Sequence, residues 1–402
     1  MKKFHKIASL ALALVMASMC FTACGDTAKE GESGSGTIKI GGIGPLTGST
    51  QIYGNAVKNG AEIAVDEINA KGGLQFELKF EDDENDAEKA TNAYNTLKDW
   101  GMQISLGAVT TQPCIAVSSL TNEDHMFALT PSGSSTDIIG GQPDADGNVT
   151  IPRKDNMFQM CFTDPNQGTK EAEYINQQKL GSKIAIIYDM SDAYSSGIYN
   201  KFKAEADKLN LEIVYEGTFT ADSATDFTSQ LNGAKNAEAD LVFLPIYYQP
   251  ASLILDQANK MNYVPKWFGV DGMDGILTLE NFDTSLAEGV MLLTPFSADA
   301  EDEKTQNFVK KYQEKCNGQI PNQFAADAYD CIYTLYEACT KAGVTADMDA
   351  STICDKLIEQ ITAEDFSMDG LTGIGITWSD TGEVNKEPRG MVIQNGVYVG
   401  MD

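Results

Sequence analysis

The chain has 402 residues, 42% of them apolar, and carries 58 acidic against 29 basic side chains for a net charge of −29 at pH 7. Nucleic acid is therefore excluded as a partner, because binding its phosphates requires a basic surface. The length and the apolar content suffice for large cores, so we expect the chain to divide into two lobes.

Residues 1–24 have the pattern of a secretory signal. Three lysines precede an apolar run that is too short to span a bilayer as a mature helix, and the small residue Ala23 precedes Cys24. The surrounding residues resemble a bacterial lipobox, which predicts a signal peptide over 1–23 and a lipidated Cys24. Cys20 fits that pattern less well, and plain secretion with an unmodified Cys24 is the alternative. The polar stretch 24–36 predicts a flexible linker.

The stretch from Thr37 to Gly73 predicts the first βα unit of a parallel sheet. It begins with alternating β-branched and small residues, typical of a strand, and continues through PLTGSTQIYGN, a segment rich in turn formers. Apolar residues then recur at helical spacing from position 57 to position 68, with charged residues at 58, 62, 66 and 67 on the opposite face. In such sheets ligands bind beyond the carboxyl ends of the strands.

The loop of this unit does not fit a dinucleotide site, because the third glycine of a G-x-G-x-x-G motif would fall at Thr47 and Pro45 intervenes. The segments IGPLTG and NGAEIAVDEINAKGG, with Tyr53 between them, instead resemble the start of periplasmic binding proteins of the branched-chain amino acid type. The resemblance implies an extracytoplasmic protein that captures an amino acid and delivers it to an ABC permease. It also implies a monomer held to the membrane only by its lipid, with no cofactor.

The βα alternation continues along the chain. Strand-like segments recur at 74–80, 104–109, 126–131, 183–189, 212–219, 241–248, 266–272 and 289–296, with amphipathic helical segments between them and a polar insertion at 142–152. Two runs of similar size predict an α/β fold of two doubly wound, Rossmann-like lobes. Two late helices, around Phe308 and around Tyr329, fit the first lobe better than the second.

In the family that the chain resembles, the backbone crosses between the lobes three times, which periodicity alone does not predict. Carried over, the N-terminal lobe spans 37–159 plus 294–386 and the C-terminal lobe spans 160–293 plus 387–402. The three crossing strands would form the hinge of a type I periplasmic binding protein fold. Two hinged lobes can close over a small molecule.

The candidate ligand residues lie where predicted strands end. The resemblance implies that the hydroxyls of Thr111 and Ser134, with backbone N–H groups nearby, hold an α-carboxylate and that Asp271 pairs with an α-ammonium. Asp271 replaces the longer glutamate of the family's best-known branched-chain binder, which predicts a larger pocket. The predicted set comprises Tyr53, Thr111, Ser132, Gly133, Ser134, Tyr194, Tyr247, Asp271 and Phe324, the aromatic members walling the side chain.

Each of these residues also has a plainer interpretation. A tyrosine at a strand end is often a partly buried packing residue. The segment from Ser132 to Ser134 could cap a helix, and Asp271 could belong to a turn, since Asp-Gly pairs are common there.

An enzyme is the competing class of function. Besides His5 in the signal, only His125 could serve a catalytic triad, and it lies in a loop with no evident partner. No GxSxG, CxxC, HExxH or P-loop motif occurs, so neither a metal nor a nucleotide is predicted. The same fold could also present its ligand to a receptor as a sensor, or bind another small solute such as an amide.

Six cysteines follow the linker. An exported protein can form disulfides, yet an even count does not require them. Cys331 and Cys339 lie eight positions apart on one predicted helix, about 12 Å along its axis, which is too far for a bond. We expect buried free thiols, with a bond between Cys339 and Cys354 as the exception to test.

Overall fold

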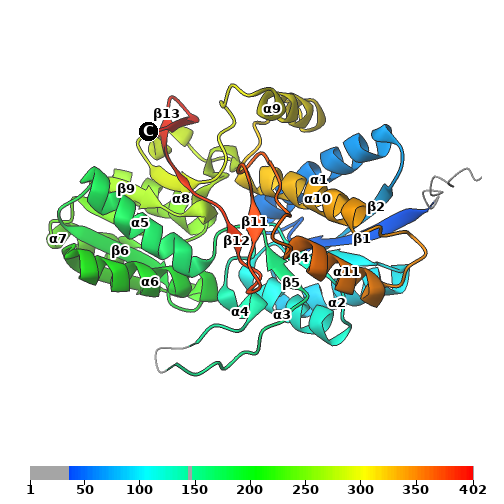
Figure 1. The fold of residues 1–402 in the computed structure, drawn as a ribbon. Helices are drawn as coiled ribbons and strands as arrows, with labels where there is room; N and C mark the ends of the chain where they lie inside the picture. The colour runs from blue at the N-terminus through cyan, green and yellow to red at the C-terminus, as the bar shows by residue number, and fades with distance from the viewer. Residues whose placement is uncertain (1–35, 144–146, 402) are drawn as a thin grey trace, which may run out of the picture. The chain divides into compact units, whose positions relative to one another are not determined.

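Two separate β-sheets organise the protein. The computed structural model describes residues 36–143 and 147–401, all within one compact unit (Figure 1). The predicted signal peptide and Cys24 lie outside the described residues. Among the helices that the structure describes, none has both the length and the apolar character needed to cross a membrane.

The first sheet has five parallel strands in the order β2-β1-β3-β4-β5. Its strands are β1 (Thr37–Gly44), β2 (Gln75–Asp82), β3 (Ile104–Leu106), β4 (Ala128–Thr130) and β5 (Met157–Gln159). The helices between them are α1 (Gln51–Lys71), α2 (Ala87–Trp100), α3 (Thr111–Glu123) and α4 (Thr136–Ile139). The predicted βα alternation is confirmed here, although β3 and β4 end earlier than their apolar segments do.

The second sheet has seven strands in the order β14-β13-β10-β9-β8-β6-β7. Five are parallel: β6 (Ile184–Asp189), β7 (Ile213–Phe219), β8 (Leu241–Leu244), β9 (Lys266–Gly269) and β10 (Met291–Thr294). The hairpin of β13 (Arg389–Gln394) and β14 (Val397–Gly400) adds an antiparallel edge to β10. The last residues of the chain thus complete a sheet that begins more than two hundred positions earlier.

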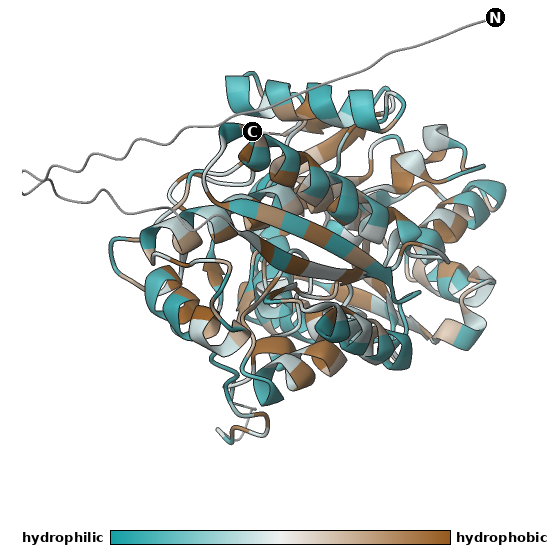
Figure 2. Cartoon of the chain, turned by 90° about the vertical axis from the view of Figure 1, so that its right-hand side faces the viewer, coloured by the Kyte–Doolittle hydropathy of each residue, from teal (hydrophilic) through white to brown (hydrophobic). Residues whose placement is uncertain are grey.

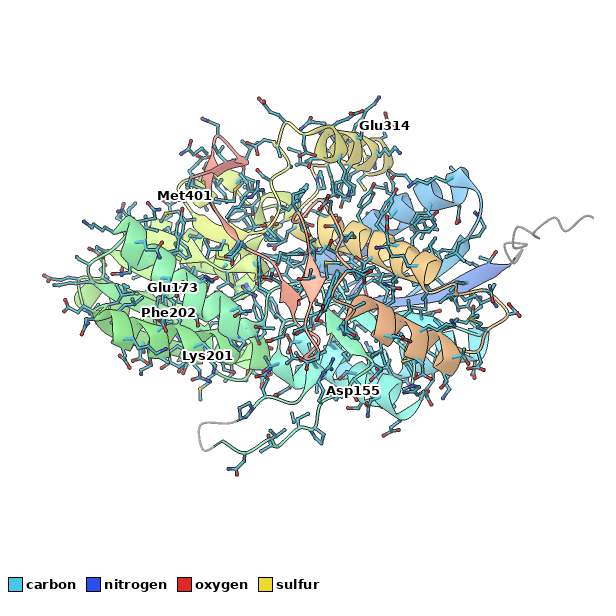
Figure 3. The ribbon with its side chains drawn as sticks, in the orientation of Figure 1. Asp155, Glu173, Lys201, Phe202, Glu314 and Met401 are labelled. Carbon is cyan, nitrogen blue, oxygen red and sulfur yellow. The ribbon has the colours of Figure 1, made fainter. Side chains whose placement is uncertain are left out.

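Helices and short turns connect the strands of the second sheet. They are α5 (Asp164–Gln178), α6 (Ala193–Leu209), α7 (Thr228–Asn236), α8 (Tyr248–Lys260) and the 3₁₀ turns η1 (Ala221–Ser223), η2 (Asp271–Met273), η3 (Ile276–Thr278) and η4 (Thr284–Ala287). Figure 2 shows amphipathic helices of the protein with teal and brown on different faces. On α6, for example, Phe202 is fully buried while its neighbour Lys201 is exposed (Figure 3).

Three late helices follow β10. They are α9 (Glu303–Lys315), α10 (Gln323–Lys341) and α11 (Ala350–Ile361), and a small two-stranded sheet of β11 (Thr377–Trp378) and β12 (Val384–Asn385) comes after them. α10 packs so closely on α1 that a Cβ at Gly60 would lie 2.0 Å from the carbonyl oxygen of Ala325. Glycine at position 60 therefore lets the two backbones meet.

Two expectations about α1 need correction. The helix begins at Gln51, so Tyr53 stands in its first turn and not in the preceding loop. Glu67 was expected on the outward face, but it accepts hydrogen bonds from the hydroxyls of Tyr329 at 2.7 Å and Tyr333 at 2.6 Å and pairs with Lys311 at 2.8 Å. Burial alone would raise the pKa of the Glu67 carboxyl. The hydrogen bonds and the ion pair outweigh burial, so this pKa is lowered from its usual value. The helix is therefore covered on two faces.

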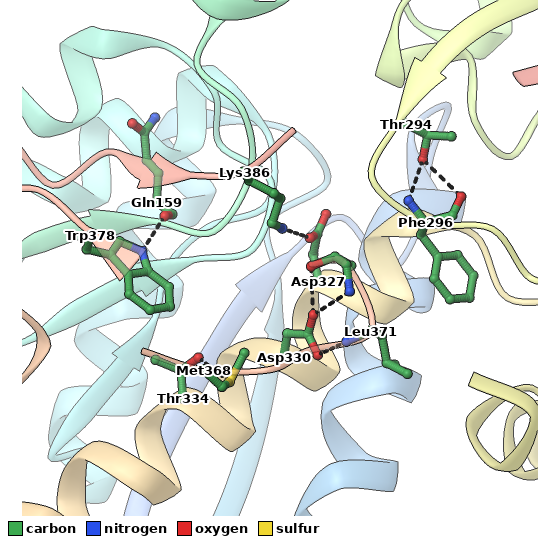
Figure 4. A network of polar contacts seen from close by, with 11 residues as sticks. Gln159, Thr294, Phe296, Asp327, Asp330, Thr334, Met368, Leu371, Trp378 and Lys386 are labelled. Carbon is green, nitrogen blue, oxygen red and sulfur yellow. Dashed lines mark hydrogen bonds and ion pairs between the residues drawn. The ribbon is translucent and has the colours of Figure 1, made fainter. Parts of the chain in front are cut away.

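A buried polar network joins α10 to the segment before β13 (Figure 4). Lys386 Nζ lies 2.6 Å from Asp327 Oδ1, and both side chains are almost completely inaccessible to solvent. One turn later, Asp330 accepts hydrogen bonds from the backbone N–H groups of Leu371 at 2.8 Å and Thr372 at 2.9 Å. Charged groups thus fix loops that apolar packing alone would leave unoriented.

All six cysteines of the described region are free. The disulfide bond between Cys339 and Cys354 that the sequence left open is therefore not formed. Five of these thiols are buried as expected, and Cys316 is only half-buried. Burial raises the pKa of the Cys114, Cys339 and Cys354 thiols to about 12, which keeps them protonated and unreactive.

Candidate ligand-binding site

Eight of the nine predicted site residues line one small cavity. The lining residues are Tyr53, Val109, Thr110, Thr111, Ser132, Ser134, Tyr194, Tyr247, Asp271, Gly272 and Phe324. They come from both sheets and from α10, segments that are far apart in the sequence. We call this cavity, with these eleven residues, the cleft site.

The loops that follow parallel strands position the cleft site. Thr111 opens α3 after β3, Tyr194 stands in the first turn of α6 after β6, Tyr247 is the N-cap of α8 after β8, and Asp271 opens the turn η2 after β9. The sequence placed these residues at strand ends, but the strands are shorter, so most of them lie at helix starts. The N-terminus of a helix such as α3 favours an anionic ligand group, because its backbone N–H groups are unpaired and its dipole is positive there.

Gly133 is the one predicted residue that does not line the cavity. Its N–H donates to Thr130 Oγ1 at 2.9 Å, and its carbonyl oxygen accepts from Gln159 Nε2 at 2.8 Å. A Cβ at this position would lie 2.4 Å from Cys114 Sγ. Gly133 therefore supports the loop from beneath. The suggested helix cap is Ser135, whose hydroxyl accepts from the Asp137 N–H, and not a residue of 132–134.

Two hydroxyls of the cleft site are buried without a hydrogen-bond partner among the described residues. They belong to Ser134, whose hydroxyl lies near the buried Asp164 carboxyl, and to Thr110, which was not among the predicted site residues. Ser132 differs, because its hydroxyl donates to the Val109 carbonyl oxygen at 2.6 Å. A buried polar group without a partner costs about 1–3 kcal/mol, so these two hydroxyls are suited to donating to an acceptor on a ligand.

Aromatic rings form the opposite wall. Tyr194 and Tyr247 stack with ring centroids 4.8 Å apart and planes 3° apart, and Tyr53 meets Phe324 edge to face at 4.8 Å. Tyr53 and Tyr247 lie 5.6 Å apart and join the two pairs. Such a wall offers a large apolar surface with hydroxyl groups at its edge.

Asp271 supplies the negative charge of the cleft site. It is 4% exposed, its Oδ1 accepts a hydrogen bond from the Tyr194 hydroxyl at 2.5 Å, and no basic side chain among the described residues forms an ion pair with it. Burial raises the pKa of the Asp271 carboxyl, and the hydrogen bonds from Tyr194 and Gln167 lower it in part. A cation placed beside Asp271 would offset the cost of burying the carboxylate.

Further acids surround Asp271 on the buried face of α5. Asp164 and Glu171 are buried, and burial, with repulsion from Asp271, raises the pKa of both well above the usual range, although the Ser134 hydroxyl lowers that of Asp164 in part. Between them, Gln167 Oε1 accepts a hydrogen bond from the Asp271 backbone N–H at 3.4 Å. These three residues were not predicted from the sequence. Their spacing of three and four positions, in step with the apolar face of α5, was the available signal.

Contacts made by the Tyr53 hydroxyl close the cleft site. The hydroxyl donates to the carbonyl oxygen of Gly272 and accepts from the Tyr248 N–H at 3.2 Å, so α1 is tied to two loops of the second sheet. The enclosed volume is about 20 Å³, room for about one water molecule. A larger ligand therefore requires these contacts to separate.

His125 has the partner that the sequence did not reveal. Its Nε2 lies 2.7 Å from Asp355 Oδ1 of α11, and both side chains are largely exposed. Among the described residues, no hydrogen bond joins His125 to a serine or cysteine side chain. The pair is a surface contact between a loop and a helix.

Comparisons with known proteins agree with this arrangement. A family model described as periplasmic binding protein matches residues 37–395. Leu/Ile/Val-binding protein homolog 3 of Brucella melitensis is 27% identical over 354 residues, which are 87% of this chain and 89% of the relative. The chain belongs to the periplasmic binding protein family.

Solved structures share the fold over nearly the whole chain. The branched-chain amino acid transporter substrate-binding protein LivJ of Streptococcus pneumoniae, in complex with isoleucine, is 26% identical with a TM-score of 0.78 and covers 91% of this chain and 100% of its own. A solute-binding protein of R. palustris in complex with benzoate is 19% identical with a TM-score of 0.77, covering 91% and 96%. The fold thus serves ligands with and without an ammonium group.

Proposed function

We propose that the protein captures an amino acid with an apolar side chain at the cleft site, outside the cytoplasm, and delivers it unchanged to an ABC permease. The observation that carries the proposal is the convergence of three features in one cavity: unpartnered hydroxyls, an aromatic wall and an unpaired carboxyl. An amino acid is the small molecule that needs all three. Its carboxylate only accepts hydrogen bonds, its ammonium only donates them, and its side chain is apolar.

The roles of individual residues follow from this match. The hydroxyls of Thr111 and Ser134, with Thr110, donate to the α-carboxylate at the start of α3. Asp271 pairs with the α-ammonium, and its acidic neighbours on α5 strengthen the preference for a cation. Tyr53, Tyr194, Tyr247 and Phe324 enclose the side chain, and Ser132 with Gly133 shapes the loop beneath the carboxylate.

Capture requires the two halves of the cleft site to move. We propose an N-terminal lobe of 37–159 plus 294–386 and a C-terminal lobe of 160–293 plus 387–402, joined by three crossings. Sheet membership supports the division. The strands of 37–159 form the five-stranded sheet, and strands of 160–293 share the seven-stranded sheet with the hairpin of 387–402. The packing of α10 on α1 supports assigning the late helices to the N-terminal lobe.

The S. pneumoniae and B. melitensis relatives support a branched-chain ligand. The test is calorimetric titration of the protein, unfolded and refolded to remove carried-over ligand, with leucine, isoleucine, valine, phenylalanine and benzoate. We expect saturable binding of at least one apolar amino acid with its chemical structure unchanged. Binding of benzoate alone would overturn the amino acid assignment, and consumption of the ligand would indicate an enzyme.

We also propose that Cys24 is lipidated and holds the protein at the outer face of the cytoplasmic membrane. The support is the sequence pattern around Cys24. The expected result is that Cys24→Ala moves the protein from the membrane fraction to the medium. A wild-type protein already found in the medium would contradict the anchor.

A further inference from the structure

A second and larger cavity lies beside α9. Its volume is about 450 Å³, within the range of about 300–1,000 Å³ typical of small-molecule sites, and it shares no lining residue with the cleft site. It is formed by Asp274, Gly275, Leu277, Thr278, Thr294, Phe296, Ala298, Asp299, Val309, Gln313, Ile320, Pro321, Asn322, Gly396, Val397 and Tyr398. We call it the α9 cavity.

The wall of the α9 cavity is mainly apolar and partly open to solvent. Ile320 and Val397 are 48% and 41% exposed, and they are two of the few large apolar side chains that the described part of the chain leaves exposed. Leu277, Phe296 and Val309 continue this surface inward. An aliphatic ligand would remove this surface from water, which contributes about 25 cal/mol per Å².

The polar end of the α9 cavity is an incompletely satisfied carboxyl. Asp274 is 4% exposed, and its Oδ2 accepts from the Gln323 N–H at 2.9 Å. Its Oδ1 is buried and has no hydrogen-bond partner within the described residues. Burial raises the pKa of Asp274 to about 6, although hydrogen bonding to the Gln323 N–H and to the Tyr398 hydroxyl lowers it in part. The same hydroxyl also lies 3.5 Å from the Met273 carbonyl oxygen.

Charge decides which head group suits this end. No lysine, arginine or histidine lines the α9 cavity, whereas Asp274 and Asp299 do. An ammonium has three donors and no acceptor, so it can satisfy Asp274 Oδ1 and neutralise the carboxylate at once. A carboxylate or phosphate ligand would be repelled by these two acids, with no basic side chain among the lining residues to offset the repulsion.

Gln323 links the α9 cavity to the cleft site. Its backbone N–H donates to Asp274, and its side-chain Nε2 donates to the carbonyl oxygen of Asp271 at 3.4 Å. The two acids also lie three residues apart around the turn η2. A ligand that moves Asp274 would therefore shift a group that holds Asp271.

We propose that the α9 cavity is a second binding site, for a small primary amine with an aliphatic body. Asp274 binds the ammonium, and Ile320, Val397 and Leu277 cover the chain. Through Gln323, occupancy of this site changes affinity at the cleft site. This coupling rests on the proposed function, whereas binding to the α9 cavity does not.

The test is calorimetric titration with n-hexylammonium and with 1-hexanol, which has the same chain without the charge. Asp274→Asn keeps an acceptor for Gln323 and should lower n-hexylammonium affinity at least tenfold. Asp299→Asn, at the same cavity, and Asp271→Asn, in the cleft site, should each leave that affinity within threefold. Ala298→Trp, which fills the cavity and leaves the Asp274 carboxyl in place, should abolish binding.

Several results would overturn the proposal. They are the absence of saturable n-hexylammonium binding, equal binding of 1-hexanol, and a loss caused by Asp271→Asn or Asp299→Asn but not by Asp274→Asn. If Asp274→Asn does not fold, the Ala298→Trp variant decides, because n-hexylammonium binding that persists in this variant would show that the ligand does not occupy the α9 cavity. If n-hexylammonium binds but does not change the affinity for leucine, only the coupling between the α9 cavity and the cleft site is refuted.

Discussion

Single hydroxyls and carboxyls distinguish the cleft site from ordinary packing between loops. Ser134 and Ser135 are neighbours in sequence, yet the Ser135 hydroxyl caps α4 while the Ser134 hydroxyl has no hydrogen-bond partner among the residues described. A group that is desolvated and unpaired lowers stability, and a ligand recovers that loss. Ser134 is therefore better explained by binding than by folding.

This difference gives a paired prediction. Ser134→Ala removes a donor to the ligand carboxylate, and hydrogen bonds to charged groups are worth about 1.5–3 kcal/mol, so leucine affinity should fall roughly tenfold to 150-fold. Ser135→Ala should leave that affinity unchanged and lower the free energy of unfolding by about 1 kcal/mol, the usual effect of a lost cap. Calorimetry and urea unfolding of both variants measure this. Equal affinities in the two variants would argue against a role for Ser134.

The sequence predicted these residues better than it predicted their neighbours. Asp271, Tyr194 and Ser134 follow apolar strands, where a parallel sheet gathers polar groups, and a family resemblance assigned their roles. Thr110 was overlooked beside Thr111 because no local pattern distinguishes two adjacent hydroxyls. The spacing of Gln167 on α5 indicates that it is buried but does not indicate its partner, because Asp271 lies 104 positions away in the sequence.

At the scale of elements, local periodicity predicted the helices and the parallel strands but not the end of the chain. The stripe on α1 is buried as expected, since positions 57, 61, 64 and 68 are fully inaccessible. The hairpin of β13 and β14 is short and joins β10 across about a hundred residues, so its partner could not be read from the sequence.

The buried pair of Lys386 and Asp327 ties α10 to the segment before β13, and breaking it should be costly. Lys386→Met leaves Asp327 buried without a counter-charge, so the free energy of unfolding should fall by about 3–5 kcal/mol. Adding Asp327→Asn should recover part of this loss. The matched control is Lys260→Met, which breaks an exposed pair with Asp256 and should cost under about 1 kcal/mol. Urea unfolding that gives similar losses for both lysines would show that Lys386 contributes no more than a surface charge.

For the whole molecule, buried acids set the dependence of stability on pH. Burial raises the pKa of Asp83 and Asp327 to about 7, and it raises the pKa of Asp192 and Asp274 to about 6. The pKa of Asp327 is raised even though the charge of Lys386 lowers it in part. A carboxyl whose folded pKa exceeds its unfolded value stabilises the fold below the unfolded pKa and loses that contribution as pH rises through the folded pKa. Carboxyls with lowered pKa values, such as Glu67, contribute above pH 5 and change little beyond it.

We therefore expect the free energy of unfolding, without ligand, to decrease between pH 5 and pH 8, and the net charge of −29 adds repulsion in the same direction. Asp83→Asn isolates one contribution, because Asp83 is buried and its Oδ2 lacks a partner within the described residues. At about 1.4 kcal/mol per pKa unit, this variant should exceed the wild type by about 2–4 kcal/mol at pH 8 and by little at pH 5. Urea unfolding at both pH values measures this. Stability that rises over this range would contradict the assignment.

We propose above all that the cleft site binds an amino acid by pairing the Asp271 carboxylate with the ammonium group of the ligand. The most direct measurement is calorimetry of wild type and Asp271→Asn with leucine and with its 2-hydroxy analogue, which lacks the ammonium. Leaving a buried ammonium without its counter-charge costs about 2–5 kcal/mol, so the variant should bind leucine at least about thirtyfold more weakly. It should bind the 2-hydroxy acid within about threefold of wild type, a shift under about 0.7 kcal/mol. If the variant binds leucine within threefold of wild type, or loses both ligands equally, Asp271 does not bind the ammonium and the account of the cleft site is wrong.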